Sequence, residues 1–194
     1  MNFNFFFNRA KNLILKPQEE WVRIEAETFS KKEIVKSYVV PFVILIAVCS
    51  IIGSSLLSID SYSISIILTK VIVTAFLFIG GVYLSALIIN ELTTSFSIPR
   101  NTDATFKLVA YSFTSFFIAM CLVSLLPDLP VLVILGFHSV YLFWLGATTV
   151  LKVSEASKTG FVIVSFLIII GIYAILSLIV GTIVAGMLYI SSPL

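Results

Sequence analysis

Hydrophobic residues along the chain gather into five long runs that follow a mixed N-terminal segment. The runs lie near residues 38–58, 64–90, 107–126, 129–150 and 160–190. Each holds the roughly 20 residues that an α-helix needs to cross the hydrocarbon core of a bilayer. The pattern predicts an all-α fold, a polytopic integral membrane helix bundle with five transmembrane helices preceded by amphipathic cytosolic helices. We expect residues 1–36 to form the cytosolic segment and residues 37–190 the membrane domain.

The first part of the N-terminal segment reads FNFFFNRAKNLIL, with apolar residues at helical spacing. The basic residues Arg9 and Lys11 interrupt the apolar ones on other faces of the helix. This arrangement is typical of a helix that lies in the headgroup plane of a membrane. We therefore predict an interfacial helix whose aromatic side chains face the bilayer and whose cations face anionic lipid.

A second amphipathic helix is predicted to begin at Pro17, since proline is tolerated at the first helical position. The sequence continues as QEEWVRIEAE, and Glu27 is spaced to pair with Lys31 one helical turn later. We expect this helix to continue past Glu27 and to dock against the bundle or the headgroups. Two interpretations remain open: the helix presents charge to a partner, or it only anchors and orients the first span.

The composition of the chain indicates that it lies in a lipid bilayer rather than in water. Hydrophobic residues make up 59% of the sequence and charged residues 11%, against roughly 25% charged residues in a typical soluble domain. Eleven of the twelve basic residues lie in the N-terminal segment, in the connection between the second and third runs, or in that between the fourth and fifth. The positive-inside rule then predicts a cytosolic N-terminus and an external C-terminus. The lipid bilayer is therefore the first expected partner.

Ionisable groups inside the membrane are the default candidates for function. Lys70 lies early in the second run, where its side chain could snorkel, pair with an aspartate of an outer turn, or serve an ion or substrate. His138 lies near the middle of the fourth run, where it could bond to Ser, Thr or Tyr of a neighbouring helix or line a transport path. Asn90 and Glu91 end the second run, and we expect them at the interface rather than buried.

Signatures of enzymes are missing from the sequence. It has one histidine, no HExxH, no GxSxG, no Walker loop and no glycine-rich nucleotide fingerprint. We therefore predict no catalytic residue, no cofactor and no metal site, and the cations beside the apolar runs give no support to nucleic-acid binding. An intramembrane lipid enzyme is the weakest alternative, and it requires Asn90, Glu91 and Asp103 to converge on a metal.

Several stretches in order resemble the Yip (Ypt/Rab-interacting protein) family in its bacterial form. They are LKPQEEWVRIEAE with Pro17, Trp21, Ile24 and Glu27, SYVVPFVILIAVCSIIGSSL with Pro41 and Gly53, KLVAYSFTSFF with Tyr111 and Ser112, and LLPDLPVLVILGFHSVYLFWLGATTVLKV with Gly146. The resemblance covers roughly residues 10–190. It departs from the family pattern at Ser115, which occupies the position of a proline.

The resemblance implies five spans with a cytosolic N-terminus, here in the bacterial inner membrane. Eukaryotic members are implicated in vesicle traffic and bind small GTPases of the Rab type, a partner that we do not carry over to this chain. We predict a non-enzymatic protein that organises the membrane or recruits a cytosolic protein, with a homo-oligomer as a further candidate partner. The residues Trp21, Glu27 and Tyr111 are candidates for this role. The alternative is a small transporter or channel that uses Lys70 and His138.

Overall fold

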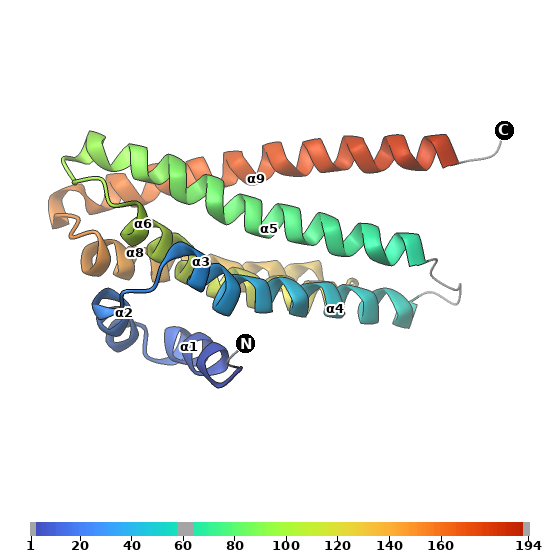
Figure 1. The fold of residues 1–194 in the computed structure, drawn as a ribbon, viewed down its shortest axis with the longest axis horizontal. Coiled ribbons are helices and arrows are strands. Elements are labelled where there is room, and N and C mark those ends of the chain that lie inside the picture. Colours follow the sequence, from blue (N-terminus) through green and yellow to red (C-terminus); the bar gives the residue numbers. More distant parts are fainter. Residues whose placement is uncertain (1–2, 58–63, 192–194) are drawn as a thin grey trace.

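The computed structural model describes residues 3–57 and 64–191, which are helical apart from short connections (Figure 1). Side chains are described for the same ranges except 54–57, 64–67, 70 and 186–191. Five helical segments in the described part of the chain are long and apolar enough to cross a membrane. The prediction of an all-α bundle with five spans is therefore confirmed, and the chain is an integral membrane protein.

Two short helices precede the spans, α1 (Phe3–Leu15) and α2 (Pro17–Ala26). The predicted continuation of the second helix past Glu27 is wrong. Ser30 and Glu33 form a capping box, in which each side chain satisfies a backbone N–H of the other residue. This box starts a new helix, so the Glu27–Lys31 pair that we expected within one helix does not form there.

The first span begins at this capping box, seven residues before the predicted boundary. It consists of α3 (Lys31–Ile34), the π-helical segment η1 (Val35–Val39) and α4 (Val40–Leu57) without interruption. The π-helical turn lies just before Pro41. Proline lacks an N–H and its ring clashes with the carbonyl four residues earlier, so a widened turn accommodates it.

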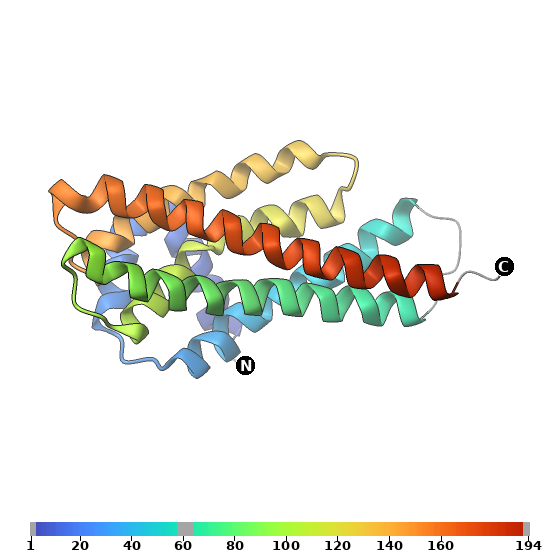
Figure 2. The ribbon, with the colours of Figure 1, turned by 90° about the horizontal axis from the view of Figure 1, so that it is seen from above.

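The other spans follow in order. They are α5 (Ile64–Leu92) with the 3₁₀ turn η2 (Thr93–Phe96), then α6 (Thr102–Ser112) with α7 (Thr114–Leu125), then η3 (Pro130–Phe137) with α8 (His138–Val150), and finally α9 (Glu155–Ser191). The long helices α5 and α9 run side by side in opposite directions in both views (Figures 1 and 2).

The basic segments gather at one end of the bundle, as the charge pattern predicted. The N-terminal helices and the connections 97–101 and 151–154 all lie at this end (Figure 1). An ion pair joins Lys152 to Glu25 of α2, and Lys31 of α3 lies 3.7 Å from Asp103 of α6. The connection 126–129 and the end of α9 lie at the opposite end (Figure 2).

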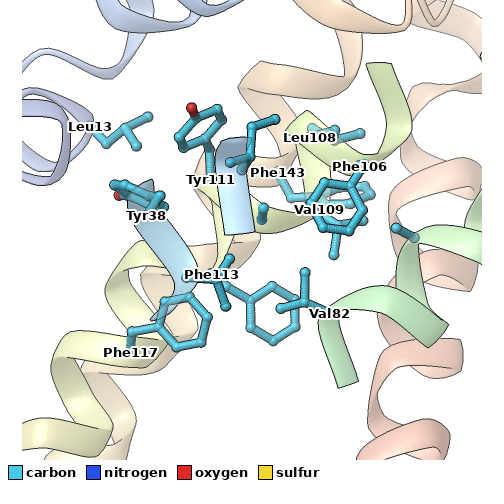
Figure 3. Close-up of a cluster of buried hydrophobic side chains, with 14 of the residues drawn as sticks. Leu13, Tyr38, Val82, Phe106, Leu108, Val109, Tyr111, Phe113, Phe117 and Phe143 are labelled. Carbon is cyan, nitrogen blue, oxygen red and sulfur yellow. The ribbon is translucent and has the colours of Figure 1, made fainter. Parts of the chain in front are cut away.

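An aromatic core joins α1 to the spans. Leu13 of α1 lies close to Tyr38 and Tyr111, which belong to the first and third spans (Figure 3). The ring centroids of Tyr38 and Tyr111 are 4.8 Å apart, and those of Phe6 and Phe42 are 4.7 Å apart. Such edge-to-face contacts stabilise the packing of α1 beyond the area it buries.

The third span contains a turn, and the fourth span changes helix type, where the two spans face each other. The third span turns at Phe113, between α6 and α7, and the fourth changes from 3₁₀ helix to α-helix at His138. The backbone N–H of Phe116 donates to the hydroxyl of Ser139, at 3.0 Å. A neighbouring side chain therefore satisfies a backbone group within the membrane, which makes the turn tolerable there.

Candidate functional site

The N-terminal helices each turn one face toward the bundle. The buried residues of α1 are Phe6, Arg9, Ala10 and Leu13, and those of α2 are Glu20, Trp21 and Ile24. Their spacing of three and four residues places them on one face of each helix. The expected α1 helix is present, but Phe6 packs on protein rather than on lipid, whereas Phe3 and Phe7 remain more than half exposed.

Arg9 is the centre of a charge cluster beneath these helices. Its Nη1 donates to Oε1 of Glu20 at 2.7 Å, and its Nη2 donates to the carboxylate of Glu27. The side chains of Arg9 and Glu20 are each 5% exposed. Asn12 also donates to Glu20, at 3.1 Å. The planar guanidinium, with several fixed donors, suits this bridging of two carboxylates.

The cluster is fastened to the third span through α6. The guanidinium of Arg9 lies 5.3 Å from the ring centroid of Tyr111, within the range of a cation–π contact. The ammonium of Lys107 donates to the backbone carbonyl of Glu27. Glu27 therefore joins α1, α2 and α6, because its carboxylate accepts from Arg9 and its carbonyl accepts from Lys107.

Trp21 provides the apolar half of the docking. Its side chain is fully buried and lies against Gly146 of α8 and Leu108 of α6. A Cβ atom added at Gly146 would lie 2.7 Å from Cζ2 of Trp21 and 2.6 Å from Cδ1 of Leu108. Glycine is required at residue 146 because any larger side chain would displace the indole.

The charge cluster is suited to holding helices together rather than to catalysis. Arg9 bridges the carboxylates of Glu20 and Glu27, and Arg23 also pairs with Glu20 at 3.3 Å, so the buried carboxylate charge is compensated, while Lys107 binds the backbone carbonyl of Glu27. Within the described part of the chain, no three His, Cys, Asp or Glu side chains are placed to hold a metal ion. The arrangement fixes the position of α1 and α2 relative to the spans.

The predicted site residues Asn90 and Glu91 lie outside this cluster. Asn90 is 4% exposed, and its Oδ1 accepts from the hydroxyl of Thr105 at 3.3 Å. Our expectation of an interfacial rather than buried position is therefore wrong for Asn90, since α6 covers it. Glu91 is exposed and pairs with Arg100 at 2.5 Å. Asp103 pairs separately with Lys31, so the side chains required for a lipid enzyme do not converge.

The two intramembrane candidates lie elsewhere. His138 forms a hydrogen bond through Nδ1 to the hydroxyl of Ser115, at 2.7 Å, which confirms the predicted bond to a serine of a neighbouring helix. Lys70 lies in α5, but its side chain is outside the described part of the chain, so its role and its predicted pairing with an aspartate stay predictions.

Of the residues that dock the N-terminal helices, the sequence analysis singles out Trp21, Glu27 and Tyr111. It does not identify Arg9, Glu20 and Lys107 as part of the site. We assigned Arg9 to the lipid headgroups because it is basic and near the N-terminus. Its spacing from Phe6 and Leu13 is the signal that places it on the buried face of α1. For Lys107 no comparable signal exists, since its partner is a backbone carbonyl 80 residues away.

Comparison with known proteins identifies one family. The family model described as Yip1 domain matches residues 11–179. This range contains most of the charge cluster, and it contains all five spans apart from the end of α9. No curated protein and no solved structure matches the chain significantly.

Proposed function

The chain belongs to the Yip1 domain family, and from this premise we propose that it acts as a non-enzymatic membrane scaffold that recruits a cytosolic protein through α2. The observation that carries the proposal is that one face of α2 is buried against the bundle while the opposite face is exposed. Trp21 is fully buried, whereas the side chain of Val22 is 61% exposed. A helix that is locked on one side presents a surface of fixed shape on the other.

The exposed face of α2 has the composition of a protein-binding surface. Its residues are Gln18, Glu19, Val22, Arg23 and Glu25, an exposed apolar side chain surrounded by charges of both signs. Because the helix is already ordered, a partner would bind without the entropic cost of folding a free segment. This supports recruitment over simple anchoring of the first span.

We assign this face to the cytosol on the distribution of basic residues. The cations of the N-terminal helices and of the connections 97–101 and 151–154 share one end of the bundle. Lysine and arginine are enriched on the cytoplasmic side of membrane proteins. The same orientation in a bacterial inner membrane would place the C-terminus outside the cell.

The proposal predicts that reversing one charge and removing the apolar side chain on the exposed face of α2 abolishes partner binding without unfolding the protein. We expect the double variant Glu19→Lys with Val22→Asp to lose specific proteins in a crosslinking pull-down from native membranes. The control also reverses one charge and replaces one exposed apolar residue with aspartate, but on the exposed face of α1: Lys11→Glu with Leu15→Asp. Both pairs lie away from the buried cluster.

Loss of the same proteins in the α2 variant alone would support recruitment. An unchanged set of partners in both variants would contradict it and favour the anchoring role. Loss in both variants would also contradict it, because the surface would then not be specific to α2.

A second candidate function is transport, favoured by the turn in the third span and the change of helix type in the fourth. Discontinuous helices near the middle of a membrane often form substrate sites in transporters, and the His138–Ser115 hydrogen bond lies at this point. This candidate predicts proton or cation flux in liposomes that hold the purified chain, with a loss of flux in His138→Ala and Lys70→Met. Liposomes without flux above the protein-free background would exclude it.

A further inference from the structure

A lateral groove opens between the third, fourth and fifth spans. Its volume is 440 Å³, within the range of roughly 300–1,000 Å³ that small-molecule sites occupy. Phe113 and Phe116 of the third span, Val140 of α8, and Ile169 and Tyr173 of α9 line its interior. The groove is separate from the charge cluster, and it lies where the third span turns at Phe113 and the fourth changes from 3₁₀ helix to α-helix.

The 3₁₀ geometry of η3 builds one wall of the groove. A 3₁₀ helix has three residues per turn, so residues three apart lie in a straight row. Val133 and Gly136 form such a row, and both line the groove. A Cβ atom added at Gly136 would lie 3.0 Å from the ring of Phe116. The glycine therefore allows η3 to approach α7 at the base of the groove.

The rim of the groove faces the lipid. The exposed fractions are 41% for Val133, 71% for Phe137 and 61% for Ile170. These residues belong to spans of the membrane domain, and Ile170 lies near the middle of α9. The opening is therefore turned toward the hydrocarbon interior of the bilayer and not toward water.

Water is a poor occupant of this space. At roughly 30 Å³ per molecule, the groove of 440 Å³ would hold on the order of 15 water molecules. Each would need two to four polar partners, but most of the lining is hydrocarbon. The hydroxyl of Ser139 already accepts from the N–H of Phe116. The hydroxyl of Tyr173 lies against Gly81 of α5, where an added Cβ would be 2.6 Å away.

We propose that this groove binds one hydrocarbon chain of a membrane lipid. An acyl chain needs no polar partner, matches the aliphatic and aromatic lining, and gains dispersion contacts that a partly filled groove lacks. Bilayer lipid also surrounds the opening at a concentration that no other apolar ligand reaches, which favours its binding by mass action. The proposal does not depend on recruitment through α2.

The test uses the full chain in nanodiscs that contain a phospholipid with a diazirine group near the middle of one acyl chain. After irradiation, we expect mass spectrometry to find several-fold more label at Val133, Phe137 and Ile170 than at Ile72 and Leu87 of α5. The two α5 residues are exposed to lipid without lining the groove. Equal labelling at both sets would overturn the proposal, since it would indicate only the ordinary lipid shell.

Two pairs of variants test occupancy directly. Ala174→Phe fills the groove from α9, and Ala185→Phe makes the same change on an exposed part of α9 outside it. Val133→Trp and Val131→Trp form a second pair on η3, of which only Val133 lines the groove. We expect the groove label to fall several-fold in the first member of each pair and to persist in the second. Label that persists in all four variants, or is lost in all four, would overturn the proposal.

Discussion

Replacing Arg9 with methionine is expected to release α1 and α2 from the end of the bundle. Methionine fills a similar space but leaves Glu20 and Glu27 without the cation that bridges them. Removing one partner of a buried ion pair costs about 3–5 kcal/mol, because the remaining charge stays desolvated. The side chains of Arg9 and Glu20 are 5% exposed, so water cannot screen this cost while the helices remain docked.

Amide hydrogen exchange in nanodiscs would measure the release. A cost of that size corresponds to exchange that is faster on the order of 100- to 5,000-fold in α1 and α2, with little change in the spans. Lys11→Met is the control, because it removes a charge from an exposed position of the same helix. Unchanged protection in Arg9→Met would show that the charge cluster does not hold the N-terminal helices.

A second variant tests whether the effect of Arg9→Met comes from the unpaired carboxylate or from lost packing. When Glu20→Leu is added to Arg9→Met, the buried pair becomes apolar on both sides. Such replacements are often neutral or stabilising, and the half-buried Glu27 can turn toward water once Arg9 is gone. We expect the double variant to recover much of the protection that the single variant loses.

Truncating Trp21 to alanine is the second change with a large expected effect. The indole is fully buried against Gly146, and loss of a buried tryptophan side chain costs about 3–5 kcal/mol through lost transfer energy and an unfilled cavity. We expect α2 to undock and the remaining fluorescence, then due to Trp144 alone, to report little change in the spans. Hydrogen exchange limited to residues 17–26 would measure the undocking.

The same contact can be tested from the side of the membrane domain. Gly146→Ala would force its new methyl group into the indole of Trp21 and is expected to weaken the docking of α2. Gly171→Ala is the matched control, since nothing lies within 4 Å of a Cβ added there. Alanine within a helix is favoured over glycine by about 0.5–1 kcal/mol, so the control should keep or raise stability. Equal effects of the two substitutions would exclude the close contact at Gly146.

The sequence predicted the spans well because a long apolar run has few alternatives to a transmembrane helix. It predicted the boundaries less well. The helix that begins at Lys31 was hidden because Glu27 and Lys31 satisfied a helical pairing rule, whereas the Ser30–Glu33 capping box won in the structure. The helical ion pair and the capping box stabilise alternative local structures by similar free energies. The local sequence therefore does not determine which of the two forms.

The contacts of the charge cluster could be predicted from the sequence even less well than the helix boundaries. The burial of Arg9 depends on two carboxylates that follow it by 11 and 18 residues and on the ring of Tyr111. The turn at Phe113 depends on Ser139, which belongs to another span. These interactions join residues that no local pattern brings together, so hydrophobic periodicity could not reveal them.

The 3₁₀ segment η3 also sets how the fourth span matches bilayer thickness. Its eight residues rise about 2.0 Å each, whereas an α-helix rises about 1.5 Å per residue, so α-helical winding would shorten the segment by about 4 Å. A mismatch of a few ångströms costs fractions of a kcal/mol per Å. A thinner bilayer would therefore favour the more compact winding, and we expect the length of this span to depend on bilayer thickness.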